Sequence, residues 1–187
     1  MITVFGSINV DLVCRVAKAP HPGETVLGSD YRLIPGGKGA NQALAARRAG
    51  APVRLVGAIG DDDIGKAALT ELDAGGVDLS GVGRRHGTTG LAIITVEDSG
   101  ENTIVVSPGA NAAASASQLG DAAFASGDTL LLQMEVPYTE GMAAAEKARH
   151  AGARVVLSIA PFTALAPADF APVSIIVVNQ HEVGRLV

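Results

Sequence analysis

The sequence predicts an α/β fold in three layers, in which a parallel sheet is covered by helices on both faces. Short apolar runs alternate along the chain with Ala-rich stretches, and short loops separate them, a rhythm typical of βαβ units. Hydrophobic residues make up 48% of the 187 residues and charged residues 18%. This composition excludes a disordered chain and is sufficient for one core. We therefore expect a single α/β domain over residues 1–187.

Five apolar runs are the predicted buried strands of this sheet. They cover residues 2–5, 53–59, 129–134, 154–159 and 174–178. Each run is short and bounded by residues that favour turns, as expected for strands covered on both sides.

Three stretches without proline are the predicted helices, and glycines end each of them. They cover residues 39–49, 64–74 and 138–151. Asp63 is the expected cap of the second helix. Asn179 could cap a further helix that starts at residue 180, and the sequence stops a few residues later. We therefore expect the domain to be incomplete at its carboxyl end, with a downstream portion missing.

Two pairs of strand-like segments interrupt this alternation without a helix between them. Residues 12–16 and 25–33 form the first pair, and residues 90–97 and 103–107 form a predicted hairpin. We expect a small antiparallel sheet built from lid segments at about 12–34 and 89–107. Such a sheet could cover a site.

Charge and composition exclude several classes of protein. The formal net charge is −5 and no basic run exceeds two residues, so a nucleic-acid partner is not expected. No apolar run is long enough to span a bilayer. The single cysteine, Cys14, excludes an intramolecular disulfide and fits a reducing compartment. With no basic segment before the first strand, we expect a cytoplasmic protein without a signal peptide.

Two polar clusters are candidates for ligand binding. Three glycines lie between residues 36 and 39, with Lys38 among them and Asn41 just after, where a helix is expected to begin. Glycines allow a ligand to approach the backbone, and free N–H groups at a helix start can bind oxygen atoms. Asn9 and Asp11 would face the same side of an extended segment after the first strand. A tight turn chosen for geometry, or a local Asx turn, would explain either cluster alone equally well.

Taken together, the motifs show a resemblance that no single cluster carries. The sequence has Gly-Ser-Ile-Asn-Val-Asp at 6–11, Pro-Gly-Glu-Thr-Val at 22–26, and Gly-Gly-Lys-Gly-Ala-Asn-Gln-Ala at 36–43. Further matches lie at 60–65, 89–90, 109–111, 133–135 and 179–182. In this order, over essentially the whole chain, they resemble the ribokinase family of carbohydrate kinases, also called the PfkB family.

The resemblance implies a set of binding residues. Sugar ligands are expected at Asn9, Asp11, Gly37, Lys38, Asn41 and Glu135, with lid contacts from Ala92 and Ile94. Asn179 and Glu182 match an element that organises the magnesium and phosphate region. No residue is assigned directly to a metal.

The same resemblance implies ATP-dependent phosphorylation of the primary hydroxyl of a sugar, with ribose favoured. Its expected cofactors are ATP and Mg²⁺, and a monovalent cation such as K⁺ is a further candidate. A homodimer formed through the lid is the expected assembly.

The sequence also departs from this family. It contains no Gly-Ala-Gly-Asp element, whose Asp is the family's general base, and no adenine-binding segments. Ser158 stands where ribokinases often have Asn. We therefore assign no catalytic residue here and expect the 187-residue chain alone to be inactive. The alternatives are a non-catalytic sugar-binding module and a family kinase for another sugar or a nucleoside.

Overall fold

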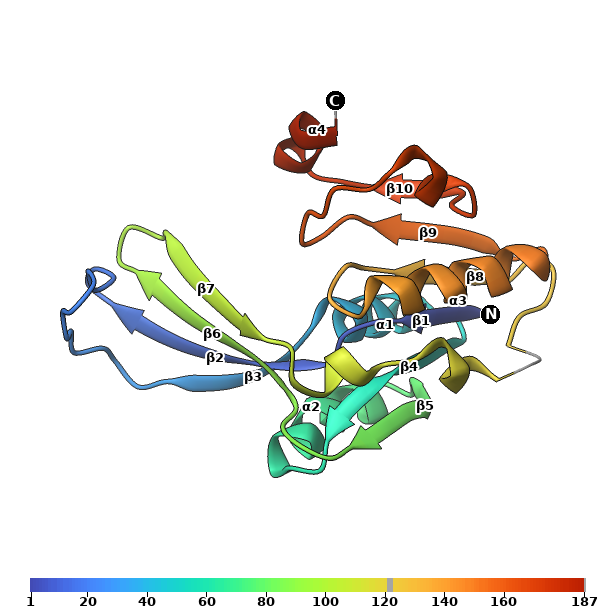
Figure 1. Cartoon of the computed structure of the whole chain (residues 1–187). Helices are drawn as coiled ribbons and strands as arrows, with labels where there is room; N and C mark the ends of the chain where they lie inside the picture. Colours follow the sequence, from blue (N-terminus) through green and yellow to red (C-terminus); the bar gives the residue numbers. More distant parts are fainter. Residues whose placement is uncertain (121–122, 187) are drawn as a thin grey trace.

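The computed structural model describes residues 1–120 and 123–186, and it contains two sheets (Figure 1). The larger sheet has six strands, and every neighbouring pair in it is parallel. Its order is β10 (Ile175–Val177), β9 (Arg154–Ser158), β8 (Thr129–Leu132), β1 (Ile2–Phe5), β4 (Val53–Gly60) and β5 (Asp78–Arg85). The predicted parallel sheet is confirmed.

Helices cover both faces of this sheet, and side chains that alternate along β1 show how. Val4 belongs to a core that includes Ala43 of α1 (Lys38–Arg48) and Leu72 of α2 (Asp63–Ala74). Phe5 belongs to the core on the opposite face, which includes Ala144 of α3 (Tyr138–His150). Because successive side chains of a strand point to opposite faces, β1 contributes to both cores. The three-layer arrangement is confirmed.

Two strands differ from the sequence-based prediction. β5 was not predicted, because Gly81 and Gly83 hide its strand pattern. A Cβ at Gly81 would lie 2.8 Å from the backbone oxygen of Leu55 on β4, so this close packing requires glycine. The predicted strand at 174–178 was expected to be buried, but the side chains of β10 are exposed. β10 lies at the edge of the sheet, and β9 is its only strand neighbour among the described residues.

The second sheet extends away from the layered part and corresponds to the expected small sheet, which we call the lid (Figure 1). Its order is β3 (Arg32–Gly36), β2 (Asn9–Val16), β6 (Gly90–Glu97) and β7 (Asn102–Ser107). The sheet is mixed, not antiparallel throughout: the outer pairs are antiparallel, but β2 and β6 run parallel. These central strands both leave the main sheet in the same direction. The predicted strand at 25–33 is also shifted, because the residues that pair with β2 are 32–36.

Short helices complete the fold. They are the 3₁₀ turns η1 (Gly109–Ala113), η2 (Ala116–Leu119) and η3 (Pro167–Phe170), and the helix α4 (Gln180–Leu186). In the described part of the chain, no helix combines the length and the apolar character that crossing a membrane requires.

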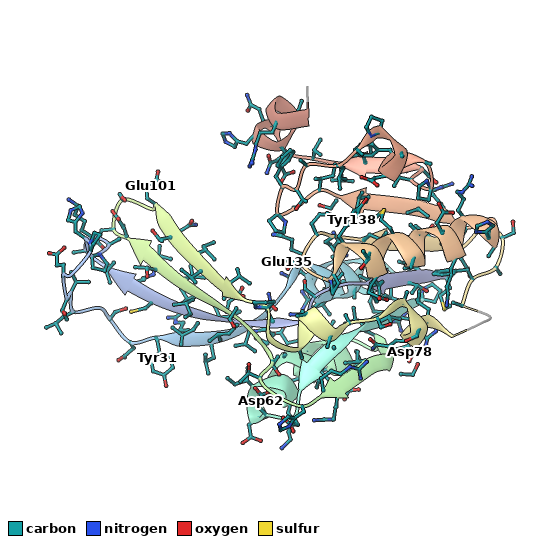
Figure 2. All side chains as sticks on the ribbon, in the orientation of Figure 1. Tyr31, Asp62, Asp78, Glu101, Glu135 and Tyr138 are labelled. Carbon is teal, nitrogen blue, oxygen red and sulfur yellow. The ribbon has the colours of Figure 1, made fainter. Side chains whose placement is uncertain are left out.

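Asp62 connects α2 to the base of the lid (Figure 2). It, and not the expected Asp63, is the N-cap of α2, because its backbone is extended and its side chain accepts a hydrogen bond from the Gly65 N–H. The same carboxylate accepts from the N–H and hydroxyl of Thr89, just before β6. Burial raises the pKa of Asp62, but these hydrogen bonds outweigh it and the net pKa is lowered.

We expect Asp62→Ala to lower the free energy of unfolding by about 1–2 kcal/mol, the usual effect of losing an N-cap. A lowered pKa means that Asp62 stabilises the fold above its ordinary pKa of 3.8, and that this contribution disappears as the pH falls toward the folded value. Urea unfolding at neutral and acidic pH measures both effects. Asp63→Ala is the matched control and should change little, since the Asp63 carboxylate forms an ion pair with the exposed Lys66. Equal effects of the two substitutions would contradict this assignment.

Candidate functional site

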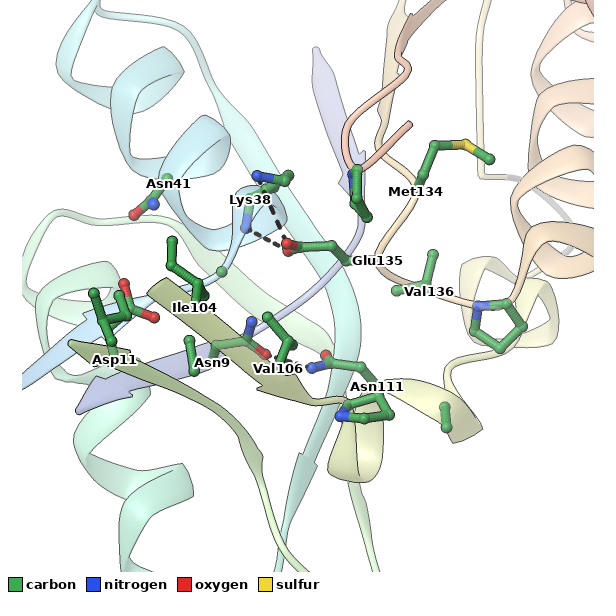
Figure 3. A pocket seen from close by; sticks show the side chains of 17 residues that line it. Asn9, Asp11, Lys38, Asn41, Ile104, Val106, Asn111, Met134, Glu135 and Val136 are labelled. Carbon is green, nitrogen blue, oxygen red and sulfur yellow. Dashed lines mark hydrogen bonds and ion pairs between the residues drawn. The ribbon is translucent and has the colours of Figure 1, made fainter. Parts of the chain in front are cut away.

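A pocket of about 660 Å³ lies where the lid meets the carboxyl ends of the central strands (Figure 3). Phe5 at the end of β1 pairs with Leu132 at the end of β8, so the segments that follow these strands are neighbours. The first carries Asn9 and Asp11, and the second carries Glu135. Open α/β sheets bind ligands at this edge.

The structure brings the eight expected binding residues together in this pocket. They are Asn9, Asp11, Gly37, Lys38, Asn41, Ala92, Ile94 and Glu135. Their role as sugar ligands stays a prediction.

The glycine-rich loop fits closely against the start of β2. Gly37 has a φ of 92°, and a Cβ there would lie 2.7 Å from the Asn9 N and 2.8 Å from the Ser7 O. Only glycine combines this backbone conformation with this approach. The loop therefore holds Lys38 and the start of α1 directly beside Asn9.

Glu135 is the polar centre of the pocket, and it lies between the lid and the layered part (Figure 2). Its Oε2 accepts hydrogen bonds from the Ser7 hydroxyl at 2.6 Å and the Lys38 N–H at 3.1 Å. Its Oε1 lies 3.7 Å from the Lys38 ammonium. The Ser7 hydroxyl and the Lys38 N–H thus hold Oε2, while the Lys38 ammonium faces Oε1.

Asp11 is the second carboxylate of the pocket. Burial, and then the negative charge of Glu135, raise the pKa of Asp11, while Lys38 acts in the opposite direction. With two carboxylates and one ammonium group, the pocket has more hydrogen-bond acceptors than the Lys38 ammonium can satisfy. Such a site suits a ligand rich in hydroxyl donors.

We expect Asp11→Asn to raise the melting temperature at neutral pH while weakening ligand binding. A raised pKa means that the charged carboxylate opposes folding above the folded pKa, and that this cost vanishes below the ordinary value of 3.8. The stabilisation should therefore shrink as the pH approaches that value. Thermal unfolding across this range measures it, with Asp30→Asn on the exposed lid loop as the control. A lower melting temperature at neutral pH would contradict the expectation.

The lid supplies an apolar wall on the same face as Asp11. Asp11 pairs with Ala92, and Ala92 pairs with Val106, so the three share one face of the sheet. By the same register, Ile94 lies opposite Ile104. Ile104 and Val106 also line the pocket and were not singled out from the sequence. Alternation along 103–107 with the predicted hairpin register could have identified them.

Asn179 and Glu182 lie outside this pocket. The Asn179 N–H donates to Glu182 Oε2 and the Glu182 N–H donates to Asn179 Oδ1, both at 2.8 Å. This reciprocal pair caps α4. Among residues 1–120 and 123–186, no group of three or more His, Cys, Asp or Glu side chains could hold a metal ion.

Two buried polar residues that support the pocket were part of the quoted motifs but received no role. Ser7 donates to Glu135, and Asn111 donates to Asn9. These contacts could not be predicted from the sequence, because Ser7 lies 128 residues from Glu135 and Asn111 lies 102 residues from Asn9.

The whole chain, residues 1–187, matches the model of the pfkB family of carbohydrate kinases. The chain belongs to this family. It is 40% identical to the ribokinase of Haemophilus influenzae over 184 residues, which cover 97% of this chain and 60% of that protein.

Solved structures of family members have the same fold. The ribokinase of Thermotoga maritima superposes with a TM-score of 0.89 at 31% identity, over 99% of this chain and 61% of that one. The ribokinase of Arabidopsis thaliana, solved with ribose and ATP, has a TM-score of 0.84 at 28% identity, over 99% of this chain and 62% of that one. The chain therefore spans about 60% of the length of these relatives.

Proposed function

We propose that this chain provides the sugar-binding part of an ATP-dependent sugar kinase, and that ribose is its favoured substrate. The observation that carries the proposal is the pocket, where Asp11, Glu135, Asn9 and Lys38 converge beneath an apolar lid. Carboxylates, amides and an ammonium group from separate loops can bind several hydroxyls of one sugar at once. The ribose bound in the Arabidopsis relative supports this choice of substrate.

The lid could also exclude water from the pocket, as a kinase requires. Phosphoryl transfer requires the acceptor hydroxyl to be in line with the γ-phosphate, while water is excluded. A sheet that contributes Ala92 and Ile94 to the pocket could close over a sugar and exclude water from it. The residues described here would then bind and orient the sugar.

We further propose that transfer needs residues outside this sequence. The sequence contains no Gly-Ala-Gly-Asp element to supply a general base, and Asn179 and Glu182 are occupied in capping α4. ATP is proposed as a cofactor because one relative was solved with ATP. Mg²⁺ is proposed with it because phosphoryl transfer requires the charge of the phosphates to be neutralised. No described residue is assigned to the magnesium ion, and we derive no step through it. A K⁺ ion stays a prediction.

Calorimetry and an activity assay test these proposals separately. We expect the 187-residue chain to bind ribose and to show no ribose-dependent formation of ADP from ATP. Absence of ribose binding would contradict the sugar site. Measurable ADP formation that depends on ribose would contradict the need for further residues. A panel of pentoses, hexoses and nucleosides would show whether ribose is preferred.

We also propose that the lid forms the contact of a homodimer. Apolar side chains of the lid are exposed on both of its faces, including Leu33, Ile34, Ile104 and Val105. Apolar surface concentrated on a projecting sheet is typical of an interaction site. Sedimentation equilibrium should show a dimer that Ile34→Asp weakens, while Thr70→Asp on α2 leaves it intact. A monomeric parent chain would contradict the proposal.

A further inference from the structure

Asn111 lies in η1, directly after the lid strand β7, and its side chain is buried against the start of β2. Its Oδ1 accepts from the Ile8 N–H at 2.9 Å. Its Nδ2 donates to the Ile8 O at 3.1 Å and to Asn9 Oδ1 at 2.7 Å. Three hydrogen-bonding groups of two consecutive residues, Ile8 and Asn9, thus meet at the Asn111 amide.

The orientation of both amides follows from the Ile8 N–H. A backbone N–H can only donate, so the oxygen of Asn111 must face it. The NH2 group of Asn111 then faces Asn9, and since two NH2 groups cannot bond to each other, Asn9 must present its oxygen there. The opposite orientation of either amide would leave buried donors facing one another.

We propose that Asn111 is a positioning residue, which fixes the Asn9 amide so that its NH2 group faces the pocket. Figure 3 shows the Asn9 nitrogen directed away from Asn111 and into the space bordered by Lys38 and Glu135. Among the described residues, none accepts a hydrogen bond from this nitrogen, whereas the Asn9 oxygen is occupied by Asn111. Asn9 is therefore a donor toward the ligand.

The inference rests on the proposed sugar site and specifies that Asn9 donates a hydrogen bond to the sugar and does not accept one from it. A hydroxyl bound there accepts a hydrogen bond from the Asn9 NH2 group and donates one to a neighbouring carboxylate, of which the pocket has two, Asp11 and Glu135. An acceptor at Asn9 would instead compete with these carboxylates for the same hydroxyl proton. The fixed amide thus favours a hydroxyl group, which can accept from Asn9 and donate to a carboxylate at the same time.

Gly90, the first residue of β6, leaves room for this pair. A Cβ at Gly90 would overlap both Asn9 Oδ1 and Asn111 Nδ2. Asn111 follows the last strand of the lid and Gly90 begins the strand before it, so both ends of the β6–β7 hairpin border the amide pair. The orientation of Asn9 therefore depends on how the lid is attached.

Asn111→Asp tests the role of the amide in binding. The new carboxylate can still accept from the Ile8 N–H, but it cannot donate to Asn9. The Asn9 amide should then rotate to donate to the carboxylate and turn its oxygen toward the pocket. We expect the affinity for ribose, measured by calorimetry, to fall about tenfold, as for the loss of one hydrogen bond.

A double-mutant cycle separates positioning from a general structural role. In an Asn9→Ala background, Asn111→Asp should cause no further loss of ribose affinity. An equal loss in both backgrounds would overturn the inference, because Asn111 would then act by a route other than Asn9.

Hydrogen exchange of side-chain amides in the unsubstituted chain tests the orientation without any sugar or any variant. The NH2 resonances of Asn111 should exchange slowly, and those of Asn9 should exchange fast because they face the pocket. The reverse order would overturn the inference. If the order is as expected but ribose does not bind, the proposed function fails while the orientation of Asn9 stands.

Discussion

Glu135→Gln is expected to weaken the binding of ribose by about 10- to 100-fold. Glu135 accepts from the Ser7 hydroxyl and the Lys38 N–H through Oε2, and its Oε1 faces the Lys38 ammonium. If the glutamine oxygen keeps the first two donors, its NH2 group must face the ammonium, which repels it. A hydrogen bond to a charged group contributes about 1.5–3 kcal/mol, and a tenfold change in affinity corresponds to about 1.4 kcal/mol.

Glu140→Gln is a closely matched control. Glu140 on α3 also accepts through Oε2 from one hydroxyl, of Ser115, and one N–H, of Ala116. It lies outside the pocket, so its substitution should disturb local structure to a similar degree and leave the ribose affinity unchanged. Calorimetry of both variants, with thermal unfolding in parallel, makes the comparison. Unchanged affinity in Glu135→Gln would contradict the assignment of Glu135 to the site.

The main sheet could be predicted from the sequence because its strands are short apolar runs between helices. β5 could not be predicted, since its close approach to β4 requires glycine at position 81, and glycine lowers the strand signal. The parallel pairing of β2 with β6 was also missed. These strands are separated in the chain by β3, α1, β4, α2 and β5. Pairing over such a distance depends on the direction in which the main sheet delivers the segments that lead into β2 and β6.

The meeting of the expected binding residues in one pocket was predicted to a greater extent than the strand pairing of the lid, because most of these residues belong to motifs. The motifs could not show which residues hold the binding side chains in position. Ser7 and Asn111 hold Glu135 and Asn9 through contacts between segments more than 100 residues apart. The cap of α2 was misplaced by one residue, since Asp62 and Asp63 are chemically identical and only backbone conformation distinguishes the cap.

Gly39→Ala is expected to lower the free energy of unfolding by about 1–3 kcal/mol and to disrupt the pocket. A Cβ at Gly39 would lie 2.6 Å from the carbonyl carbon of Gly6 and 2.6 Å from the Ser7 N. Both are backbone atoms of the turn between β1 and β2, so the start of α1 would have to move. Overpacking of this kind costs about 1–3 kcal/mol. The movement would also strain the hydrogen bond from the Ala40 N–H to the Ser7 O.

Gly141→Ala in α3 is the control that distinguishes the steric effect of a Cβ at position 39 from the general effect of replacing glycine by alanine in a helix. Both glycines are buried in helices, but a Cβ at Gly141 would meet no atom within 4 Å. Alanine favours a helix over glycine by about 1 kcal/mol, so Gly141→Ala should be neutral or stabilising. Urea unfolding of the two variants should therefore give changes of opposite sign. A stable Gly39→Ala chain that still binds ribose would show that the junction of α1 with the β1–β2 turn tolerates displacement, and that the pocket does not depend on this close approach.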